Sequence, residues 1–355
     1  MKENIPGAVS ILLGNGNGTF QPNTDFQTGL NSYYVAVGDF NKDGKQDLAV
    51  ANWGDGTVSV LLGNGDGTFQ PQVQYVTGNT PSSVAVGDFN EDGNLDLAVT
   101  DANGVAVSIL LGRGDGSFLN PSKYPTEFAG LSVVVGDFDH DGKQDLAIAA
   151  SNLDILLGNG DGTFQPYVSY PTPAEAGSVA LGDFNRDGNQ DLAVTSSGNN
   201  SYLVNVFLGS GDGTFQAPEN YAVNYSPYCV AVGDFNRDKS ADIVTSNANG
   251  TLSVLLNEAG TYVRVASLPN PSQQGQPVTF AAKVTAAVNG SGLPTGSVTF
   301  ASGSKMANIA IISNGIAKFT TSKIPAGTHK VTARYSGDTN FNPNQSAPIT
   351  QVVNP

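Results

Sequence analysis

The sequence contains few of the residues on which most catalytic and disulfide-rich proteins depend. Its single cysteine, Cys229, excludes an internal disulfide, and its two histidines, His140 and His329, lie far apart in the chain. We therefore expect neither a zinc site of the usual cysteine and histidine type nor a histidine-based acid–base pair. Cys229 precedes the apolar run VAVGDF, which favours a buried structural thiol over a nucleophile.

Charge and long apolar runs are also scarce. Only 13% of the residues are charged, against about 25% in an ordinary globular chain, and the net charge of −15 argues against nucleic acids or anionic membrane surfaces as partners. No apolar run is long enough to span a bilayer, so membrane insertion is not expected. The segment Met1–Val9 has no apolar core of a secretion signal, which leads us to expect a fragment of a longer protein.

What the chain does have is a nine-residue acidic loop that occurs five times. The loops begin 49, 49, 46 and 51 residues apart, and a period near fifty indicates a repeat fold. The copies are DFNKDGKQD (Asp39–Asp47), DFNEDGNLD (Asp88–Asp96), DFDHDGKQD (Asp137–Asp145), DFNRDGNQD (Asp183–Asp191) and DFNRDKSAD (Asp234–Asp242).

Calcium is the cation that suits such a loop, because Ca²⁺ takes about six to eight oxygen ligands. Asp or Asn at positions 1, 3 and 5 points oxygens inward, glycine at position 6 permits the sharp turn, and Asp at position 9 closes the cage. The flanks alternate and are β-branched, so each loop joins two strands rather than the helices of an EF-hand. The predicted ligands, with position 7 acting through its backbone carbonyl, are Asp39, Asn41, Asp43, Lys45 and Asp47; Asp88, Asn90, Asp92, Asn94 and Asp96; Asp137, Asp139, Asp141, Lys143 and Asp145; Asp183, Asn185, Asp187, Asn189 and Asp191; and Asp234, Asn236, Asp238, Ser240 and Asp242.

A single copy has another interpretation, a turn that merely closes a hairpin. Five copies with the same ligand spacing favour Ca²⁺, and we expect about five sites. The fifth loop has Lys239 where the others have glycine. If position 6 needs a positive φ, the side chain of Lys239 makes the fifth site the weakest.

A second motif lies between the acidic loops. Its Asn-Gly or Asp-Gly core is a strong hairpin signal, because glycine adopts positive φ without steric cost. Asp66, Asp115, Asp161 and Asp212 are therefore predicted to be turn residues rather than ligands. The copies are LLGNGNGTF (Leu12–Phe20), LLGNGDGTF (Leu61–Phe69), LLGRGDGSF (Leu110–Phe118), LLGNGDGTF (Leu156–Phe164) and FLGSGDGTF (Phe207–Phe215), and a sixth, LLNEAGTY (Leu255–Tyr262), has degenerated.

One complete repeat predicts four short antiparallel strands, which in the second repeat are SSVAVGDF, DLAVTD, VAVSILLG and FLNPSKY. Four strands per period are typical of a β-propeller blade. Because strand direction alternates, the acidic loop and the Gly-Asp-Gly turn must share one rim, while Trp53 and the Tyr225–Tyr228 stretch lie on the other, metal-free rim. Five full units are visible, and Ala8–Phe26 supplies only the third and fourth strands of a sixth. The blade number and the closure of the ring stay open.

The combination of DFNxDGxxD with LLGNGDGTF resembles FG-GAP repeats, also called VCBS-type repeats, of bacterial surface proteins, which are similar to the blades of the integrin α-subunit head. The resemblance extends from about Ala8 to Tyr262. It implies a propeller, Ca²⁺ in the acidic loops, and recognition or adhesion outside the cell or at its surface.

The composition changes near residue 262, where the acidic loops stop. The segments that follow, from QPVTFAAKVTA to APITQVV, predict about seven short strands of an immunoglobulin-like sandwich. The landmarks PTGSVTF (Pro294–Phe300) and IPAGTHKVTARYSGDTNF (Ile324–Phe341) resemble bacterial Ig-like modules, which implies a spacer or stalk. We predict a propeller over residues 1–262 and a sandwich over 263–355, and TYVRVASL (Thr261–Leu268) fits either.

Together these features favour an all-β, non-catalytic, Ca²⁺-binding recognition or adhesion module of a secreted or cell-surface bacterial protein, with an unidentified extracellular protein or glycan as partner. The alternatives are a carbohydrate-binding propeller or a glycan lyase or hydrolase, because the metal-free rim is rich in Asn, Ser and Tyr. A third interpretation is a spacer that Ca²⁺ makes rigid. The sequence decides neither the ligand nor the oligomeric state.

Overall fold

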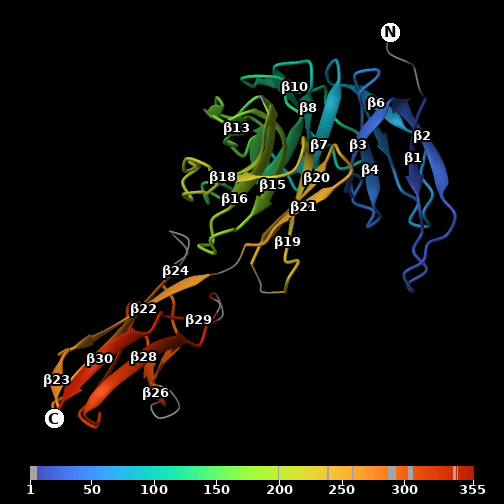
Figure 1. Cartoon of the computed structure of the whole chain (residues 1–355). Helices are drawn as coiled ribbons and strands as arrows, with labels where there is room; N and C mark the ends of the chain where they lie inside the picture. The colour runs from blue at the N-terminus through green and yellow to red at the C-terminus, as the bar shows by residue number, and fades with distance from the viewer. Residues whose placement is uncertain are drawn as a thin grey trace. The chain divides into compact units, whose positions relative to one another are not determined.

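The computed structural model describes residues 6–198, 200–237, 240–257, 260–286, 293–302, 307–338, 341 and 343–355. Asp238 and Lys239 of the fifth loop, and the first five residues, lie outside them. All regular structure in the described residues is β-strand (Figure 1), and no helix suited to crossing a membrane occurs among them. The chain divides into two compact units: residues 1–182, 189–232 and 243–254 form the first, and residues 183–188, 233–242 and 255–355 form the second.

Each sequence period folds into one antiparallel sheet whose strands pair in chain order, as the repeat pattern predicts. Four sheets have all four strands, a two-stranded sheet precedes them, and a three-stranded sheet follows them. The strands are β1 (Pro6–Ile11) and β2 (Thr24–Leu30); β3 (Ser32–Gly38), β4 (Asp47–Asn52), β5 (Thr57–Leu61) and β6 (Val73–Val76); β7 (Pro81–Gly87), β8 (Asp96–Asp101), β9 (Ala106–Leu110) and β10 (Ser122–Pro125); β11 (Ser132–Gly136), β12 (Asp145–Ala149), β13 (Leu153–Leu156) and β14 (Val168–Tyr170); β15 (Glu175–Gly182), β16 (Asp191–Gly198), β17 (Ser201–Phe207) and β18 (Glu219–Ala222); and β19 (Pro227–Gly233), β20 (Asp242–Asn247) and β21 (Leu252–Leu255).

The fifth full unit of the sequence therefore has three strands rather than four in the described residues. The segment that would supply its fourth strand, Thr261–Leu268, is β22 and pairs along its whole length with β24 (Val278–Ala286). The Gly-Asp-Gly hairpin that returns the chain to the sheet in the other repeats is degenerate here, at Leu255–Tyr262. The ambiguous segment TYVRVASL thus belongs to the sandwich.

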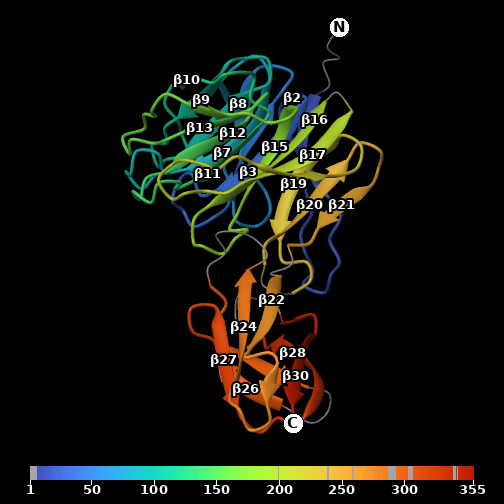
Figure 2. The same cartoon turned by 60° about the vertical axis from the view of Figure 1, so that its left-hand side comes forward.

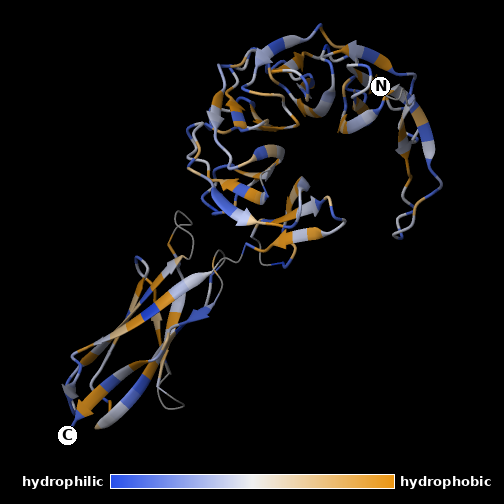
Figure 3. Cartoon of the chain, turned by 45° about the horizontal axis from the view of Figure 1, so that its top comes forward, coloured by the Kyte–Doolittle hydropathy of each residue, from blue (hydrophilic) through white to orange (hydrophobic). Residues whose placement is uncertain are grey.

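Consecutive sheets of the first unit pack face to face along an arc (Figure 3). One apolar cluster combines Phe40, Ala49 and Val58 of one sheet with Val84 and Leu97 of the next. Because neighbouring sheets cover both of their faces, β4 and β8 are buried at every position. Strands that are covered on both faces have nearly continuous apolar sequences. Within the described residues, no strand of the β1–β2 sheet pairs with the β19–β21 sheet.

Aromatic side chains tie each sheet to the next. Phe40, at position 2 of the first acidic loop, contacts Phe118 in the Gly-Asp-Gly turn of the next sheet, with ring centroids 5.5 Å apart. At the ends of the series, the equivalent Phe20 and Phe235 have no aromatic neighbour among the described residues, and they are 63% and 51% exposed. The exposure of these two side chains marks where the series of described sheets stops.

The expectation of a buried Cys229 is wrong, because this side chain is exposed. In three other sheets the position is occupied by a serine that accepts a hydrogen bond from the first strand of the next sheet, as Ser83 does from Val133 N at 3.4 Å. Cys229 lies on β19, in the last repeat sheet, and in the described residues no further repeat sheet follows to donate such a bond.

The C-terminal strands form a two-sheet sandwich (Figure 2). One sheet has the order β22–β24–β27, and the other has the order β23–β30–β28–β25–β26, with β29 paired to β28. Phe280, Phe300 and Tyr335 are fully buried between them. The further strands are β23 (Ser272–Gln273), β25 (Ser297–Ala301), β26 (Ala307–Ile311), β27 (Ile316–Thr321), β28 (Gly327–Tyr335), β29 (Asn344–Gln345) and β30 (Ile349–Asn354).

Candidate metal centres

The acidic loops are held in shape by their own backbone N–H groups. In the first loop, Asp39 accepts hydrogen bonds from Asp43 N at 3.1 Å and Gly44 N at 2.9 Å, and Asn41 Oδ1 accepts from Asp43 N at 3.1 Å. These bonds curl the chain so that positions 1 and 3 face the interior of the loop. The second loop repeats the pattern with Asp88, Asn90 and Asp92.

The last acidic residue of each loop connects it to the Gly-Asp-Gly turn of the same sheet. Asp47 is fully buried and accepts from Phe40 N at 2.8 Å and from Gly63 N at 2.7 Å. This bond places the loop and the turn on one rim, as predicted from strand direction. Equivalent bonds to the amide that opens the next turn or loop occur at Asp96, Asp145, Asp191 and Asp242.

The third loop offers the most direct test of whether a cation fits. Oxygens of Asp137, Asp139 and Asp145 all lie within 4.8 Å of one another. The Oδ1 atom of Asp137 is buried and has no hydrogen-bond partner. A buried carboxylate oxygen without a partner is costly unless a cation or proton balances it. Three converging carboxylates with one unpartnered oxygen are a donor set that fits Ca²⁺.

Burial of the last carboxylate in a loop raises the pKa of that carboxylate. Burial, together with the neighbouring carboxylates of Asp88 and Asp92, raises the pKa of Asp96 to about 6. Burial, with Asp137 and Asp139 nearby, likewise raises the pKa of Asp145 to about 6. A cation in the loop would oppose both shifts, since it favours the charged carboxylates.

The φ angles explain the glycine at position 6. Gly44, Gly93, Gly142 and Gly188 have φ of 80°, 79°, 88° and 88°, a region that L side chains rarely adopt. Sequence reasoning missed a second left-handed position. Position 4 also has positive φ although it carries a side chain, with values of 58°, 55°, 58°, 58° and 64° at Lys42, Glu91, His140, Arg186 and Arg237.

Not every predicted ligand faces the centre of its loop. Asp43 forms an ion pair with Lys45 at 3.2 Å, and Asp141 forms one with Lys143 at 2.7 Å. The position-5 carboxylates in these two loops are thus neutralised by the position-7 side chains, and Asp141 is not in the group formed by Asp137, Asp139 and Asp145. Asp238 lies outside the described residues. The backbone carbonyl at position 7 stays a predicted ligand.

Neighbouring loops are linked to one another, which the repeat pattern did not reveal. Asp88 N donates to Gln144 Oε1 at 2.7 Å, and Asp137 N donates to Gln190 Oε1 at 3.0 Å. Exposed His140 also contacts Asn189 through its Nε2, at 3.0 Å. The available signal was glutamine at position 8, which occurs in three of the five loops.

The aspartates of the Gly-Asp-Gly turns close those turns, as predicted. Asp66 Oδ1 accepts from Thr68 N at 3.0 Å and from Thr68 Oγ1 at 2.6 Å. Gly65 and Gly67 on either side have φ of 82° and 88°. Asp115, Asp161 and Asp212 repeat this arrangement.

The two histidines lie in different units of the chain. His140 belongs to the first unit, whereas His329 belongs to the second and contacts the carbonyl of Pro325 through its Nε2 at 2.8 Å.

Sequence comparisons identify both parts of the chain. The FG-GAP-like repeat matches residues 4–50, 39–99, 88–148, 141–194 and 183–245, and the bacterial Ig-like domain (group 3) matches residues 263–354. No curated protein sequence matches the chain.

Two solved structures are similar in outline. The biofilm matrix protein Bap1 of V. cholerae has 13% identity and a TM-score of 0.43 over 99% of this chain and 67% of that one. The extracellular domain of BT4673 from B. thetaiotaomicron has 10% identity and a TM-score of 0.40, and the match covers 93% of this chain but only 43% of that one. The repeats, which span more than half of the sequence, show that the chain belongs to the FG-GAP-like repeat family, joined to a bacterial Ig-like domain.

Proposed function

We propose that the acidic loops bind Ca²⁺ and that the repeat region is a Ca²⁺-stabilised, non-catalytic recognition or adhesion module of an extracellular bacterial protein. The observation that carries the proposal is the third loop, where three carboxylates converge and the buried Oδ1 of Asp137 has no partner. The other loops share its spacing, and the first two share its hydrogen bonds from the position-5 N–H to position 3 and from the position-6 N–H to position 1.

Within this loop, Asp137, Asp139 and Asp145 would hold the ion. Bound Ca²⁺ supplies positive charge that balances the clustered carboxylates. Asp137 follows β11 and Asp145 begins β12, so the ion would connect two adjacent strands of one sheet. The stabilisation therefore acts on the sheet itself and not only on the loop.

An extracellular setting agrees with this chemistry. Extracellular calcium modules have dissociation constants of about 10⁻⁴–10⁻³ M, so such sites fill where Ca²⁺ is abundant. The two families found in the chain are typical of extracellular recognition and adhesion proteins. A rim made rigid by ions would present the opposite, metal-free rim to a partner.

Asp137→Asn is the variant that tests the metal. The Asp137 Oδ2 atom accepts from Gly142 N at 3.1 Å, and asparagine can keep that bond while its amide nitrogen replaces the unpartnered oxygen. The variant should fold but lose one Ca²⁺ in calorimetric titration. Asp161→Asn, the same change of charge in a Gly-Asp-Gly turn, is the matched control and should bind as many ions as the unmodified chain. A chain that takes up no Ca²⁺, or equal uptake by both variants, contradicts the proposal.

A further inference from the structure

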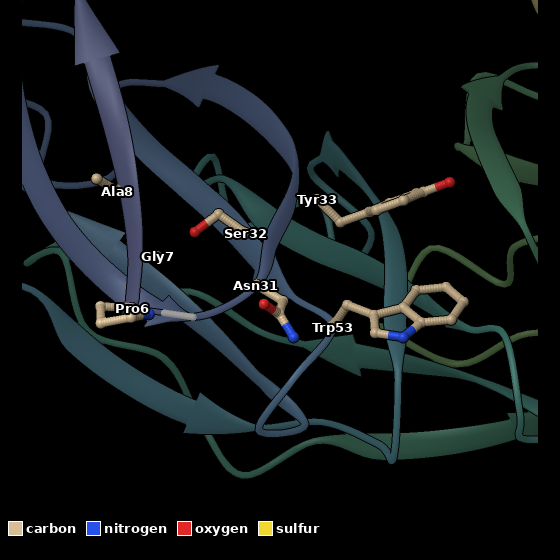
Figure 4. Close-up of a pocket in the computed structure, with 7 residues that line it drawn as sticks. All are labelled: Pro6, Gly7, Ala8, Asn31, Ser32, Tyr33 and Trp53. Carbon is tan, nitrogen blue, oxygen red and sulfur yellow. The ribbon is translucent and has the colours of Figure 1, made fainter. Parts of the chain in front are cut away.

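A pocket of about 420 Å³ opens on the metal-free rim (Figure 4). Strands β3 and β4 pair from Gly38↔Asp47, beside the first acidic loop, to Ser32↔Asn52, beside the pocket. The strands therefore separate the pocket from the loop by about 20 Å. The pocket is lined by Pro6, Gly7, Ala8, Asn31, Ser32, Tyr33 and Trp53.

Two aromatic rings form one side of this pocket. The centroids of Tyr33 and Trp53 lie 5.2 Å apart with their planes inclined by 40°, and Figure 4 shows both rings projecting on the side opposite Pro6. Tyr33 is 65% exposed. Tyrosine and tryptophan combine a large apolar face with a polar tip and are enriched where they meet a partner.

The pocket is preorganised by the backbone. Trp53 N donates to Asn31 O at 3.0 Å, and Gly54 N donates to Leu30 O at 2.8 Å, which fixes the turn that carries the indole ring. The opposite wall is equally fixed. A Cβ added at Gly7 would lie 2.0 Å from the carbonyl oxygen of Gly29, so only glycine fits there. A rigid pocket loses little conformational freedom on binding.

The chemistry of the lining favours a neutral ligand. None of its seven residues carries a charge. The nearest carboxylate in the turn, Asp55, accepts from Leu30 N at 2.8 Å and from Thr57 Oγ1 at 2.7 Å, so both oxygens are engaged. The two ring surfaces lie beside the amide of Asn31 and the hydroxyl of Ser32, which bonds to Thr28 Oγ1 and, as a hydroxyl, has the capacity for a further hydrogen bond. A sugar ring has matching parts, since its C–H face packs on aromatic rings and its hydroxyls bond to amides and hydroxyls.

We infer that this pocket binds one neutral pyranose unit of a glycan, packed against Tyr33 and Trp53 and hydrogen-bonded near Asn31 and Ser32. This inference rests on the proposed function, because it names the class of ligand that the recognition module takes. A second ring pair, Tyr202 and Tyr225 with centroids 4.9 Å apart, lies on the same rim and provides an internal control.

Trp53 is the only tryptophan in the chain, so its fluorescence reports directly on the pocket. The full chain in millimolar Ca²⁺ is titrated with the methyl glycosides of glucose, galactose, mannose and N-acetylglucosamine. At least one should change the emission in a saturable way. Tyr33→Ala should weaken that binding by about tenfold or more, Tyr33→Phe should keep it within about threefold, and Tyr225→Ala should leave it unchanged.

Three outcomes overturn the inference: no saturable response to any of these sugars, equal binding by Tyr33→Ala, or tighter binding of choline or glucuronate than of every neutral sugar. The fold of each variant is checked by its melting curve. A calcium titration of the same samples keeps the two proposals separate. A chain that binds Ca²⁺ but no sugar overturns the pocket alone, whereas one that binds sugar but no Ca²⁺ overturns the metal sites alone.

Discussion

The repeat region and the sandwich carry opposite net charges. Residues 1–262 carry 30 acidic and 9 basic side chains, for a net charge of −21, whereas residues 263–355 carry 1 acidic and 7 basic side chains, for a net charge of +6. In the repeats, 17 of the acidic side chains lie in the five acidic loops. The excess negative charge therefore has a definite place, and cations are what would balance it.

The two regions also differ in how their apolar cores are organised. The sandwich has one continuous apolar cluster, centred on Phe280, Phe300 and Tyr335. The repeat sheets bury apolar side chains in separate clusters between neighbours. Each of these clusters holds together two sheets, so the series depends on every interface. An all-β chain can thus bury its apolar side chains either in a single core or in many small interfaces between sheets.

Removal of Ca²⁺ should produce the largest difference between the two regions, which is a difference in thermal stability. At tenfold excess over the dissociation constant, each site contributes about 1.4 kcal/mol, so five sites would contribute roughly 7 kcal/mol. That is comparable to the whole net stability of a typical domain. Scanning calorimetry of the full chain should show a repeat transition that falls by many degrees in EGTA and a sandwich transition that does not move.

Equal repeat transitions with and without EGTA would contradict the metal sites. A shift of the sandwich transition would mean that it holds a site of its own. Its one acidic residue, Asp338, argues against this, because it already accepts from Thr295 N at 2.7 Å and Phe341 N at 2.9 Å.

The converse change targets the sandwich. Phe300 is fully buried between its sheets, and truncation to alanine should cost about 3–5 kcal/mol through lost burial and a residual cavity. Phe300→Ala should lower the sandwich transition by the same amount in Ca²⁺ and in EGTA and leave the repeat transition unchanged. The solvent-exposed change Thr328→Ala on β28 is the control. A calcium-dependent loss would show that the two regions are energetically coupled.

Acid should reduce the increase in melting temperature that Ca²⁺ gives the repeat region. Without metal, Asp96 and Asp145 have pKa values raised to about 6, so they stabilise the metal-free fold below about pH 4 and lose that contribution as pH rises through 6. Calcium needs both carboxylates charged, so its affinity at these sites should fall by about tenfold per pH unit below 6. Melting of dialysed, metal-free protein with and without added Ca²⁺ should give a difference that grows from pH 4.5 to pH 7. A difference independent of pH would refute the shifted pKa values.

Much of the fold could be predicted because the same strand and turn motifs occur in every repeat. Alternation in YVAVGDF, the glycines of LLGNGDGTF and the fixed period determine strands, turns and their order without any long-range information. The fate of Thr261–Leu268 could not be predicted, because its alternating pattern suits either sheet and only the pairing with β24 decides it. The exposure of Cys229 could not be predicted either, because it depends on whether a further repeat sheet packs on β19.

In the candidate sites, too, local features could be predicted, whereas features that depend on neighbouring elements could not. Position 6 and the turn aspartates are local features, and the structure agrees with the sequence there. The ion pairs of Asp43 and Asp141 and the bond from Asp88 N to Gln144 depend on rotamers and on the next loop. The pocket at Tyr33 and Trp53 combines residues of two strands, β1 and β3, with Asn31 and a turn, so no single motif predicts it.

The smallest expected effect concerns a single residue of the fifth loop. The four glycines at position 6 have φ between 79° and 88°, and the fifth loop has Lys239 there. A side chain held in that region costs on the order of 1–2 kcal/mol, and one decade of affinity corresponds to about 1.4 kcal/mol. Lys239→Gly should therefore tighten the weakest class of Ca²⁺ site by about tenfold in a calorimetric titration. Lys239→Ala removes the same charge but keeps a Cβ, so it separates backbone strain from repulsion between lysine and the ion. If alanine and glycine tighten the site equally, charge is the cause, and if five equivalent sites appear before and after both changes, the fifth loop has no defect.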